Sequence, residues 1–94
     1  MSDEEIAQLR EEIAAMDREI VSLVARRLYL AEQVGLEKRL SDQPVRVSEV
    51  EAQVVARIEA EGANRGIRPH FAKSLGHLLI EESVHRQETI ALPN

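Results

Sequence analysis

Hydrophobic residues recur along the N-terminal part of the chain in alternating steps of three and four positions. The series contains Ile6, Leu9, Ile13, Met16, Ile20, Leu23, Leu30 and Val34, with a single gap before Leu30. This spacing is typical of an amphipathic helix with a coiled-coil-like seam. Ser2 and Glu5 fit a capping box at its start. The pattern therefore predicts one helix over about residues 3–39, roughly 55 Å long at ~1.5 Å per residue.

Two shorter amphipathic segments follow, each preceded by turn-forming residues. The first break covers residues 41–44 and ends in a proline, and the second runs from Gly62 through Gly66 to Pro69. Proline disfavours helix in the residue before it, and glycine suits a helix C-cap. We expect helices over about residues 47–61 and 69–90. Their apolar residues are Val47, Val50, Val54, Val55 and Ile58 in the former, and Phe71, Leu75, Leu78, Leu79 and Ile80 in the latter.

The three segments predict an all-α fold in which residues 1–94 form a single domain, because this length leaves no room for a second core. A compact globule of this size has a radius of gyration of about 12 Å. The long first helix would extend well beyond such a globule and leave its apolar seam in water. A second copy of the chain is the simplest cover for that seam. We therefore expect an intertwined six-helix homodimer.

Composition and charge exclude several classes of function. The net charge of -5 argues against a nucleic-acid-binding surface. The chain has no cysteine, which excludes disulfides and thiolate metal sites. The N-terminus is acidic and amphipathic, unlike a signal peptide, and no apolar run reaches the ~18 residues of a membrane span. We expect a cytoplasmic protein that binds neither membranes nor nucleic acid.

Each predicted helix carries polar residues at positions where its pattern calls for apolar ones. Arg27 fills the gap in the first seam, and Lys38 continues the same series ~16 Å further along the helix. Glu51 interrupts the apolar stripe of the second helix, and Ser83 and Gln87 interrupt that of the third. Two cations, a carboxylate, a hydroxyl and an amide thus point inward. This set suits the binding and electrostatic stabilisation of a small anion, and it does not suit covalent catalysis.

These polar residues also have purely structural interpretations. Arg27 and Lys38 could extend to solvent or pair with acidic groups. Ser48 and Glu51 fit a second capping box, and Gln87 could form a hydrogen bond between helices. Taken one at a time, each of these structural readings competes with a ligand-binding role. The functional interpretation rests on the three helices showing the same feature together.

A possible metal site lies on the third predicted helix. His77, Glu81 and His85 have spacings of four residues, which would place them on one helical face. Such spacing arises often by chance, and these residues do not share the face of Ser83 and Gln87. We therefore expect no bound metal and interpret this face as solvated.

Taken in order, the residues and their spacing resemble the all-helical, type II chorismate mutase family. The resemblance covers nearly the whole chain, through LREEIAAMDREIVSLVARR, LAEQVGLEK, a loop ending in PVR, and LLIEESVHRQ. It implies a dimer of three-helix chains with a long first helix. It also implies an isomerase that converts chorismate, a small dicarboxylate, to prephenate without a cofactor.

The resemblance also implies a role for each inward-pointing polar residue. Arg27 resembles the arginine that binds a substrate carboxylate, and Ser83 resembles a hydroxyl that does the same. Lys38 and Gln87 resemble the two donors to the ether oxygen of the substrate, and Glu51 resembles the carboxylate that holds the ring hydroxyl.

Arg10 resembles the arginine that reaches into the partner's active site. It lies ~25 Å along the helix from Arg27, too far for one small ligand to bridge both within a chain. The chain departs from the family pattern at Val47, where an acidic residue is common, and at Val50, where an arginine is common. Arg46 lies four residues before Val50, and we expect it to replace that charge from the same helical face, as a substrate-binding residue.

Three alternatives stay open at this stage. Without the family arginine, Glu51 could accept an ammonium, so 4-amino-4-deoxychorismate is a second candidate substrate. A related lyase that acts on isochorismate shares the fold. The third alternative is a non-catalytic helical dimerisation module, in which replacing Arg27 or Lys38 by leucine would only stabilise the dimer.

Overall fold

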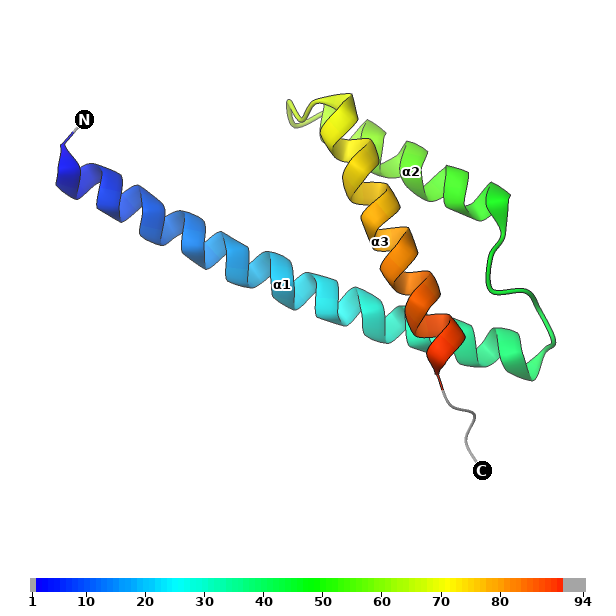
Figure 1. Cartoon of the computed structure of the whole chain (residues 1–94). Coiled ribbons are helices and arrows are strands. Elements are labelled where there is room, and N and C mark those ends of the chain that lie inside the picture. The colour runs from blue at the N-terminus through cyan, green and yellow to red at the C-terminus, as the bar shows by residue number, and fades with distance from the viewer. Residues whose placement is uncertain (1, 91–94) are drawn as a thin grey trace.

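The computed structural model describes residues 2–90, which form three helices joined by two turns (Figure 1). Helix α1 comprises Asp3–Leu40, α2 comprises Ser48–Ala63 and α3 comprises Pro69–Thr89. The predicted all-helical class is confirmed for these residues, and each predicted helix end lies within two residues of the observed one. Residues 1 and 91–94 of the predicted single domain lie outside the described part of the chain.

Helix α1 is closed at both ends by local hydrogen bonds. Ser2 is the N-cap, and its side-chain oxygen accepts a hydrogen bond of 3.2 Å from the backbone N–H of Glu5. At the other end Asp42 adopts a left-handed φ of 56°, and the N–H of Gln43 donates to the carbonyl oxygen of Lys38 at 2.7 Å. This is the bond of a Schellman motif, with aspartate at the position that glycine usually occupies. It turns the chain back toward the other helices.

The start of α2 differs from the sequence prediction. Val47 is its N-cap and Ser48 is already helical, so the expected capping box of Ser48 and Glu51 is wrong. The side chain of Glu51 instead pairs with Arg46. A carboxylate held by both Nε and Nη2 of Arg46 does not turn back to the backbone N–H at the start of the helix. The first turn of α2 therefore has no side-chain cap.

Helix α3 lies between the other two helices and holds them together. It packs against both α1 and α2, whereas α1 and α2 do not pack directly on each other within residues 2–90 (Figure 1). Small residues allow this close packing: a Cβ added at Gly76 would lie 3.5 Å from the Cα of Val55 on α2. The turn before α3 is closed by Gly66, whose φ of 74° is left-handed. From this turn α2 and α3 diverge, so that the two helices form a V (Figure 1).

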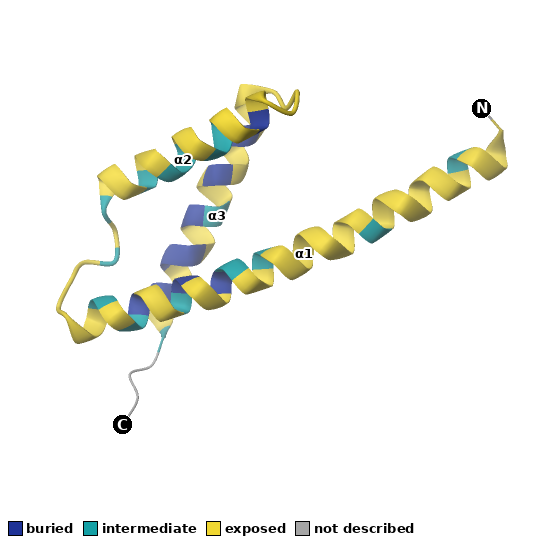
Figure 2. Ribbon diagram, turned by 180° about the vertical axis from the view of Figure 1, so that it is seen from behind, coloured by how far each residue is buried: buried dark blue, intermediate teal, exposed yellow. Residues whose placement is uncertain are grey.

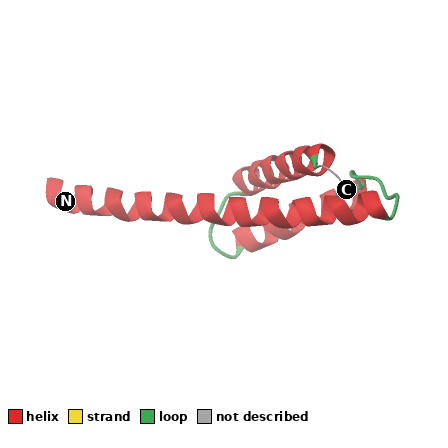
Figure 3. Cartoon of the chain, turned by 90° about the horizontal axis from the view of Figure 1, so that it is seen from below, coloured by secondary structure: helices red, strands yellow, loops and turns green. Residues whose placement is uncertain are grey.

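The N-terminal half of α1 extends beyond the rest of the molecule, while α2 and α3 lie beside its C-terminal half (Figure 3). The radius of gyration is 17.2 Å and the longest dimension is 59 Å. This radius exceeds the about 12 Å of a compact globule of the same size. The apolar seam of this half is exposed (Figure 2), with Ile13 and Leu23 each at 59% exposure. The predicted projection of the first helix is therefore confirmed.

The hydrophobic core of the single chain is small. Among residues 2–90 the buried hydrophobic residues are Leu28, Ala31, Ala72, Ile80 and Val84. The stripe of Phe71, Leu75 and Leu78, on which the sequence analysis based the third helix, is instead largely exposed. Helix α3 packs on its chain through a neighbouring face of mostly small residues. No helix in residues 2–90 combines the length and apolar character needed to cross a membrane.

Candidate active site

A cavity of about 270 Å³ lies between the three helices and the segment that joins α1 to α2. All five polar residues that interrupt the apolar stripes of the sequence line this cavity: Arg27, Lys38, Glu51, Ser83 and Gln87. The lining side chains come from all three helices, and α3, which packs against both α1 and α2, forms one side of the cavity. The cavity volume is close to the ~300 Å³ of the smallest ligand pockets, so it suits one small molecule.

Arg27 on α1 is the cation at one side of this cavity. Its Nη1 donates to the Ser83 hydroxyl at 2.7 Å and more weakly to the carbonyl oxygen of Leu79 at 3.4 Å. Burial lowers the pKa of the Arg27 guanidinium, and the positive charge of Arg57 lowers it further. Arginine stays charged at neutral pH despite such shifts. Partial desolvation beside a second cation therefore leaves Arg27 ready to gain from an anionic ligand.

Arg57 is a residue that the sequence analysis did not identify. It lies seven residues after Val50, which is two helical turns, so it shares that face of α2. The sequence shows this spacing, but it does not show that the charge of Arg57 acts on Arg27. Arg57 does not line the cavity, so it acts on the site only through its charge on Arg27.

Lys38 lies in the last turn of α1. Its Nζ donates to the carbonyl oxygen of Val45 at 2.8 Å, which fixes the ammonium beside the segment joining α1 to α2. An ammonium has three N–H donors, and this bond uses one of them. No ion pair is found for Lys38 within residues 2–90. The remaining donors can therefore serve a ligand in the cavity that Lys38 lines.

Gln87 on α3 is buried, and its Oε1 has no hydrogen-bond partner among the described residues. An unsatisfied buried polar atom costs about 1–3 kcal/mol, so such atoms often mark functional sites. A half-turn of the amide exchanges its oxygen and nitrogen, which differ little in shape. The same position can therefore offer either an acceptor or a donor to a ligand.

Gly35 sets the position of Gln87, and the sequence analysis did not identify this role. A Cβ added at Gly35 would lie 2.8 Å from the Cγ and 2.9 Å from the Cα of Gln87. Contacts this short are not tolerated, so only glycine lets α3 approach α1 at this level. The close approach presses the Gln87 side chain against α1 and limits its rotamers.

Glu51 enters the cavity wall from α2, with its side chain 26% exposed. Arg46 binds it through two hydrogen bonds, Nε to Oε2 at 3.2 Å and Nη2 to Oε1 at 2.9 Å. Glu51 therefore has a cation beside it, although Val50 stands where the family commonly has an arginine. Arg46 precedes the N-cap of α2, so the expectation that it shares a helical face with Val50 is wrong. Arg46 is not among the residues that line the cavity.

Arg46 binds a second carboxylate, that of Glu81 on α3. The ion pair joins Nη2 and Oε1 at 2.7 Å. The hydrogen bonds that Arg46 donates to Glu51 and Glu81 raise the pKa of its guanidinium, and the bond to Glu81 lowers the pKa of the Glu81 carboxyl. In the sequence, the spacing of Glu81 from His77 and His85 indicated only a possible metal site and did not predict the ion pair with Arg46. Residues 2–90 contain no cluster of three or more histidine, aspartate or glutamate side chains arranged to hold a metal ion.

The wall of the cavity formed by α2 and the preceding segment is mostly apolar. Val47 and Val50, the two residues that depart from the family pattern, both line it, together with Val54. Arg27, Lys38 and Gln87 belong to α1 and α3 on the other side. A ligand in this cavity would contact an apolar wall on one side and hydrogen-bond donors on the other.

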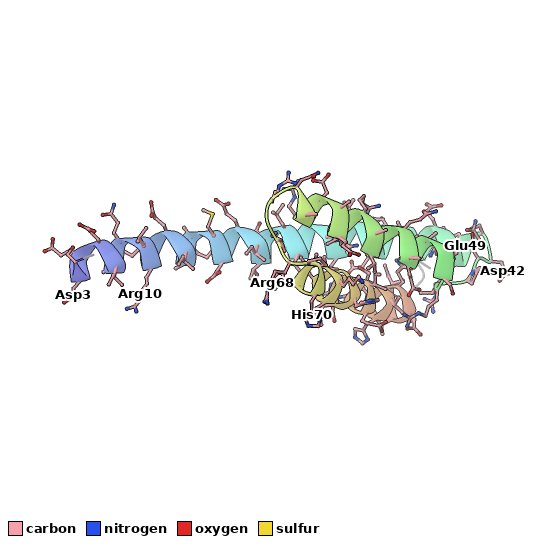
Figure 4. All side chains as sticks on the ribbon, turned by 90° about the horizontal axis from the view of Figure 1, so that it is seen from above. Asp3, Arg10, Asp42, Glu49, Arg68 and His70 are labelled. Atoms are coloured by element: carbon pink, nitrogen blue, oxygen red, sulfur yellow. The ribbon has the colours of Figure 1, made fainter. Side chains whose placement is uncertain are left out.

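Arg10 is the one candidate that the chain does not bring near the cavity. It lies toward the free end of α1, while Asp42 marks the opposite end of the molecule (Figure 4). Arg10 is exposed and does not line the cavity of its own chain. This placement agrees with the axial separation of Arg10 and Arg27 expected from the sequence.

Comparison with known proteins gives a consistent result. The family described as chorismate mutase type II matches residues 9–88, which include every cavity-lining residue. A bifunctional chorismate mutase/prephenate dehydratase of Escherichia coli (strain K12) is 35% identical over 89 residues, 95% of this chain and 23% of that protein. The protein of the same name from Enterobacter agglomerans is 29% identical over 98% of this chain and 24% of its own length.

The T-protein of Enterobacter agglomerans is 30% identical over 79 residues, 84% of this chain and 21% of that protein. The chain thus spans about a quarter of the length of the curated relatives it matches. The match to the family covers the long helix from residue 9 onward, together with the cavity and its polar residues. The resemblance noted in the sequence is therefore confirmed, and the chain belongs to the chorismate mutase type II family.

Proposed function

We propose that this chain catalyses the Claisen rearrangement of chorismate to prephenate. The observation that carries the proposal is the cavity in which Arg27, Lys38 and Gln87 converge opposite an apolar wall. In this reaction the ether C–O bond breaks while a C–C bond forms, and the electrons move within one molecule. The protein's task is to fold the enolpyruvyl arm over the ring and to stabilise charge growing on the ether oxygen.

Each cavity residue has a role in this proposal. Arg27, with Ser83 beside it, binds a substrate carboxylate through its guanidinium fork. Lys38 and Gln87 donate to the ether oxygen, and these bonds strengthen as negative charge develops there. Glu51 accepts a hydrogen bond from the ring hydroxyl. A gain of ~10⁶ in rate asks for about 8 kcal/mol, which orientation and charge-assisted donors together can supply.

We also propose a homodimer in which each site takes Arg10 from the partner. One chain offers the cavity a single guanidinium at hydrogen-bonding distance of Ser83, whereas the substrate carries two carboxylates. The exposed seam of α1 and the small core support a partner that covers this helix. An antiparallel second copy of α1 would carry its own Arg10 toward the cavity.

Chorismate is the better candidate of the two substrates considered. The case for 4-amino-4-deoxychorismate depended on a Glu51 without a cation beside it, and Arg46 lies 2.9 Å from Glu51. A non-catalytic dimerisation module has no use for a cavity that gathers five polar residues from three helices. The ion pair at Glu51 and the polar lining of the cavity therefore favour the chorismate proposal.

The direct test is to assay purified protein for prephenate formation from chorismate, with the 4-amino compound assayed in parallel. We expect turnover of chorismate, and we expect Arg27→Ala to lower kcat/KM by at least about a hundredfold, since two hydrogen bonds to a charged group are lost. Arg26→Ala is the matched control, because Arg26 is the exposed neighbour outside the cavity. An inactive wild-type protein, or equal losses in both variants, would contradict the proposal.

A further inference from the structure

Arg46 joins three parts of the fold. It belongs to the segment between α1 and α2, it binds Glu51 on α2 at 2.9 Å, and it binds Glu81 on α3 at 2.7 Å. The same segment is held to α1 by the bond from Lys38 Nζ to the Val45 carbonyl oxygen. The chain between α1 and α2 is thus fastened to all three helices beside the cavity.

The guanidinium of Arg46 binds both carboxylates through two atoms each. Nε and Nη2 donate to Glu51 at 3.2 and 2.9 Å, and Nη1 and Nη2 donate to Glu81 at 3.4 and 2.7 Å. A guanidinium has five N–H donors in a planar fork. Four of them are directed at these two carboxylates, which leaves little capacity for a substrate carboxylate. A lysine could not reproduce this double contact.

The exposure of the three side chains shows what this arrangement is suited to do. Arg46 is 50% and Glu81 is 63% exposed, and exposed ion pairs add little to folding stability. Glu51 is the least exposed of the three and the one that lines the cavity. We call Arg46, Glu51 and Glu81 the charge cluster. The charge cluster therefore affects mainly the orientation of the Glu51 carboxylate and the charge that a ligand meets beside it.

We propose that Arg46 and Glu81 are positioning residues for Glu51 and that their charges set which group the site accepts beside it. Arg46 holds the Glu51 carboxylate in one orientation at the cavity wall, and Glu81 holds Arg46. The cation offsets the charge of Glu51, so a neutral hydroxyl is accepted there in preference to an ammonium. This inference rests on the proposed function and deepens it, because it names the determinant that selects a hydroxyl-bearing substrate.

We define the substrate ratio as kcat/KM for chorismate divided by kcat/KM for its 4-amino analogue. The charges of the cluster predict whether each variant raises or lowers this ratio. Arg46→Ala leaves two uncompensated carboxylates, so the ratio should fall roughly three- to tenfold. Glu81→Gln removes one negative charge and should leave the ratio unchanged or raise it. Arg46→Lys keeps the charge but loses the double contact, so the ratio should stay near the wild-type value.

The same variants separate positioning from charge. For chorismate, Arg46→Ala and Arg46→Lys should both lower kcat/KM by about tenfold, mainly through a higher KM, because the contact of Glu51 with the hydroxyl exists before and during the reaction. Arg65→Ala and Glu61→Gln are matched controls, since Arg65 and Glu61 form a similarly exposed ion pair away from this cavity. Both controls should leave the ratio and kcat/KM within about twofold of wild type.

The outcomes of this experiment are distinct. Full activity of Arg46→Lys on chorismate would overturn the positioning role, and an unchanged substrate ratio in Arg46→Ala would overturn the selection by charge. In either case an active wild type that loses activity through Arg27→Ala leaves the proposed function intact. A wild type inactive on both substrates would overturn the proposed function and this inference with it. Helical content and Tm of each variant verify that the fold is retained.

Discussion

The polar side chains of the cavity have few hydrogen-bond partners within the chain, so they keep donors and acceptors that a ligand can use. Arg27 is partly desolvated beside Arg57, with a hydroxyl and a carbonyl as its partners. Lys38 gives one bond to Val45, and Gln87 keeps a buried amide oxygen without a partner. A fold selected only for stability would satisfy such groups or replace them with apolar ones. Each of these groups can gain further hydrogen bonds from a ligand in the cavity.

Replacing Lys38 or Gln87 by alanine should lower kcat far more than it raises KM. Both side chains act on charge that grows on the ether oxygen and is largest in the transition state, so their loss removes stabilisation there. We expect about 10²-fold or more for each in kcat, as for other donors to a developing oxyanion. Steady-state kinetics with chorismate measure this. A variant at Lys38 that raised KM alone would assign the lysine to ground-state binding instead.

The site residues that could be predicted from sequence are those that interrupt a local pattern. Arg27, Glu51 and Gln87 stand at apolar positions of their helices, and that is visible without a structure. Glu81 interrupts nothing, and its partner Arg46 lies 35 residues away in the chain. Its role depends on how α2 and α3 face each other. The period of a helix gives the direction of a side chain, but it does not give the neighbour that the side chain meets.

Helices are the scale at which the sequence was most informative, because their signals are local. The alternating steps of three and four and the residues of the turns gave α1 to within one residue of Asp3–Leu40. The packing between helices was not predictable in the same way. The stripe of Phe71, Leu75 and Leu78 looked like the packing face of α3, yet the observed face contains Gly76 and Ala72. Small residues carry no periodic hydrophobic signal, although they decide how closely two helices approach.

The contact of α1 with α3 can be tested at Gly35. In Gly35→Ala the new Cβ would lie 2.8 Å from the Gln87 side chain, so the two helices must move apart and Gln87 must shift. We expect overpacking to cost about 1–3 kcal/mol, partly offset by the ~1 kcal/mol that alanine gains over glycine in a helix. Activity should fall more steeply than stability. Urea unfolding and kcat/KM for chorismate measure the two effects.

Gly76→Ala is the matched control for this helix contact. Its Cβ would lie 3.5 Å from Val55, which is an ordinary contact, so helix propensity should dominate. We expect Gly76→Ala to be neutral or up to about 1 kcal/mol more stable, with activity retained. If both glycine variants behaved alike, the close approach at Gly35 would not be what positions Gln87.

At the scale of the whole molecule, a single chain leaves a long apolar surface uncovered. A single copy spans 59 × 30 × 15 Å and leaves the seam of α1 exposed along its projecting half. The chain also separates its own candidate arginines, with Arg27 at the cavity and Arg10 far along the same helix. The proposed dimer accounts for both the exposed seam and the separation of the two arginines. In the proposed dimer, the helix that covers the seam of its partner would also carry Arg10 to the partner's cavity.

Mixing two inactive variants tests this shared site. In a heterodimer of an Arg10→Ala chain and an Arg27→Ala chain, one cavity combines the intact Arg27 of the first chain with the intact Arg10 of the second. The other cavity lacks both. With random exchange of subunits about half of the dimers are heterodimers, so about a quarter of all cavities are complete. We therefore expect the equimolar mixture to recover roughly a quarter of wild-type activity, well above either parent.

Mixing Arg10→Ala with the double variant Arg10→Ala/Arg27→Ala should recover none, because no pairing of these chains restores Arg10. If exchange is verified by mass-labelled subunits and the first mixture stays at the level of its parents, each cavity works within one chain and Arg10 has no part in it.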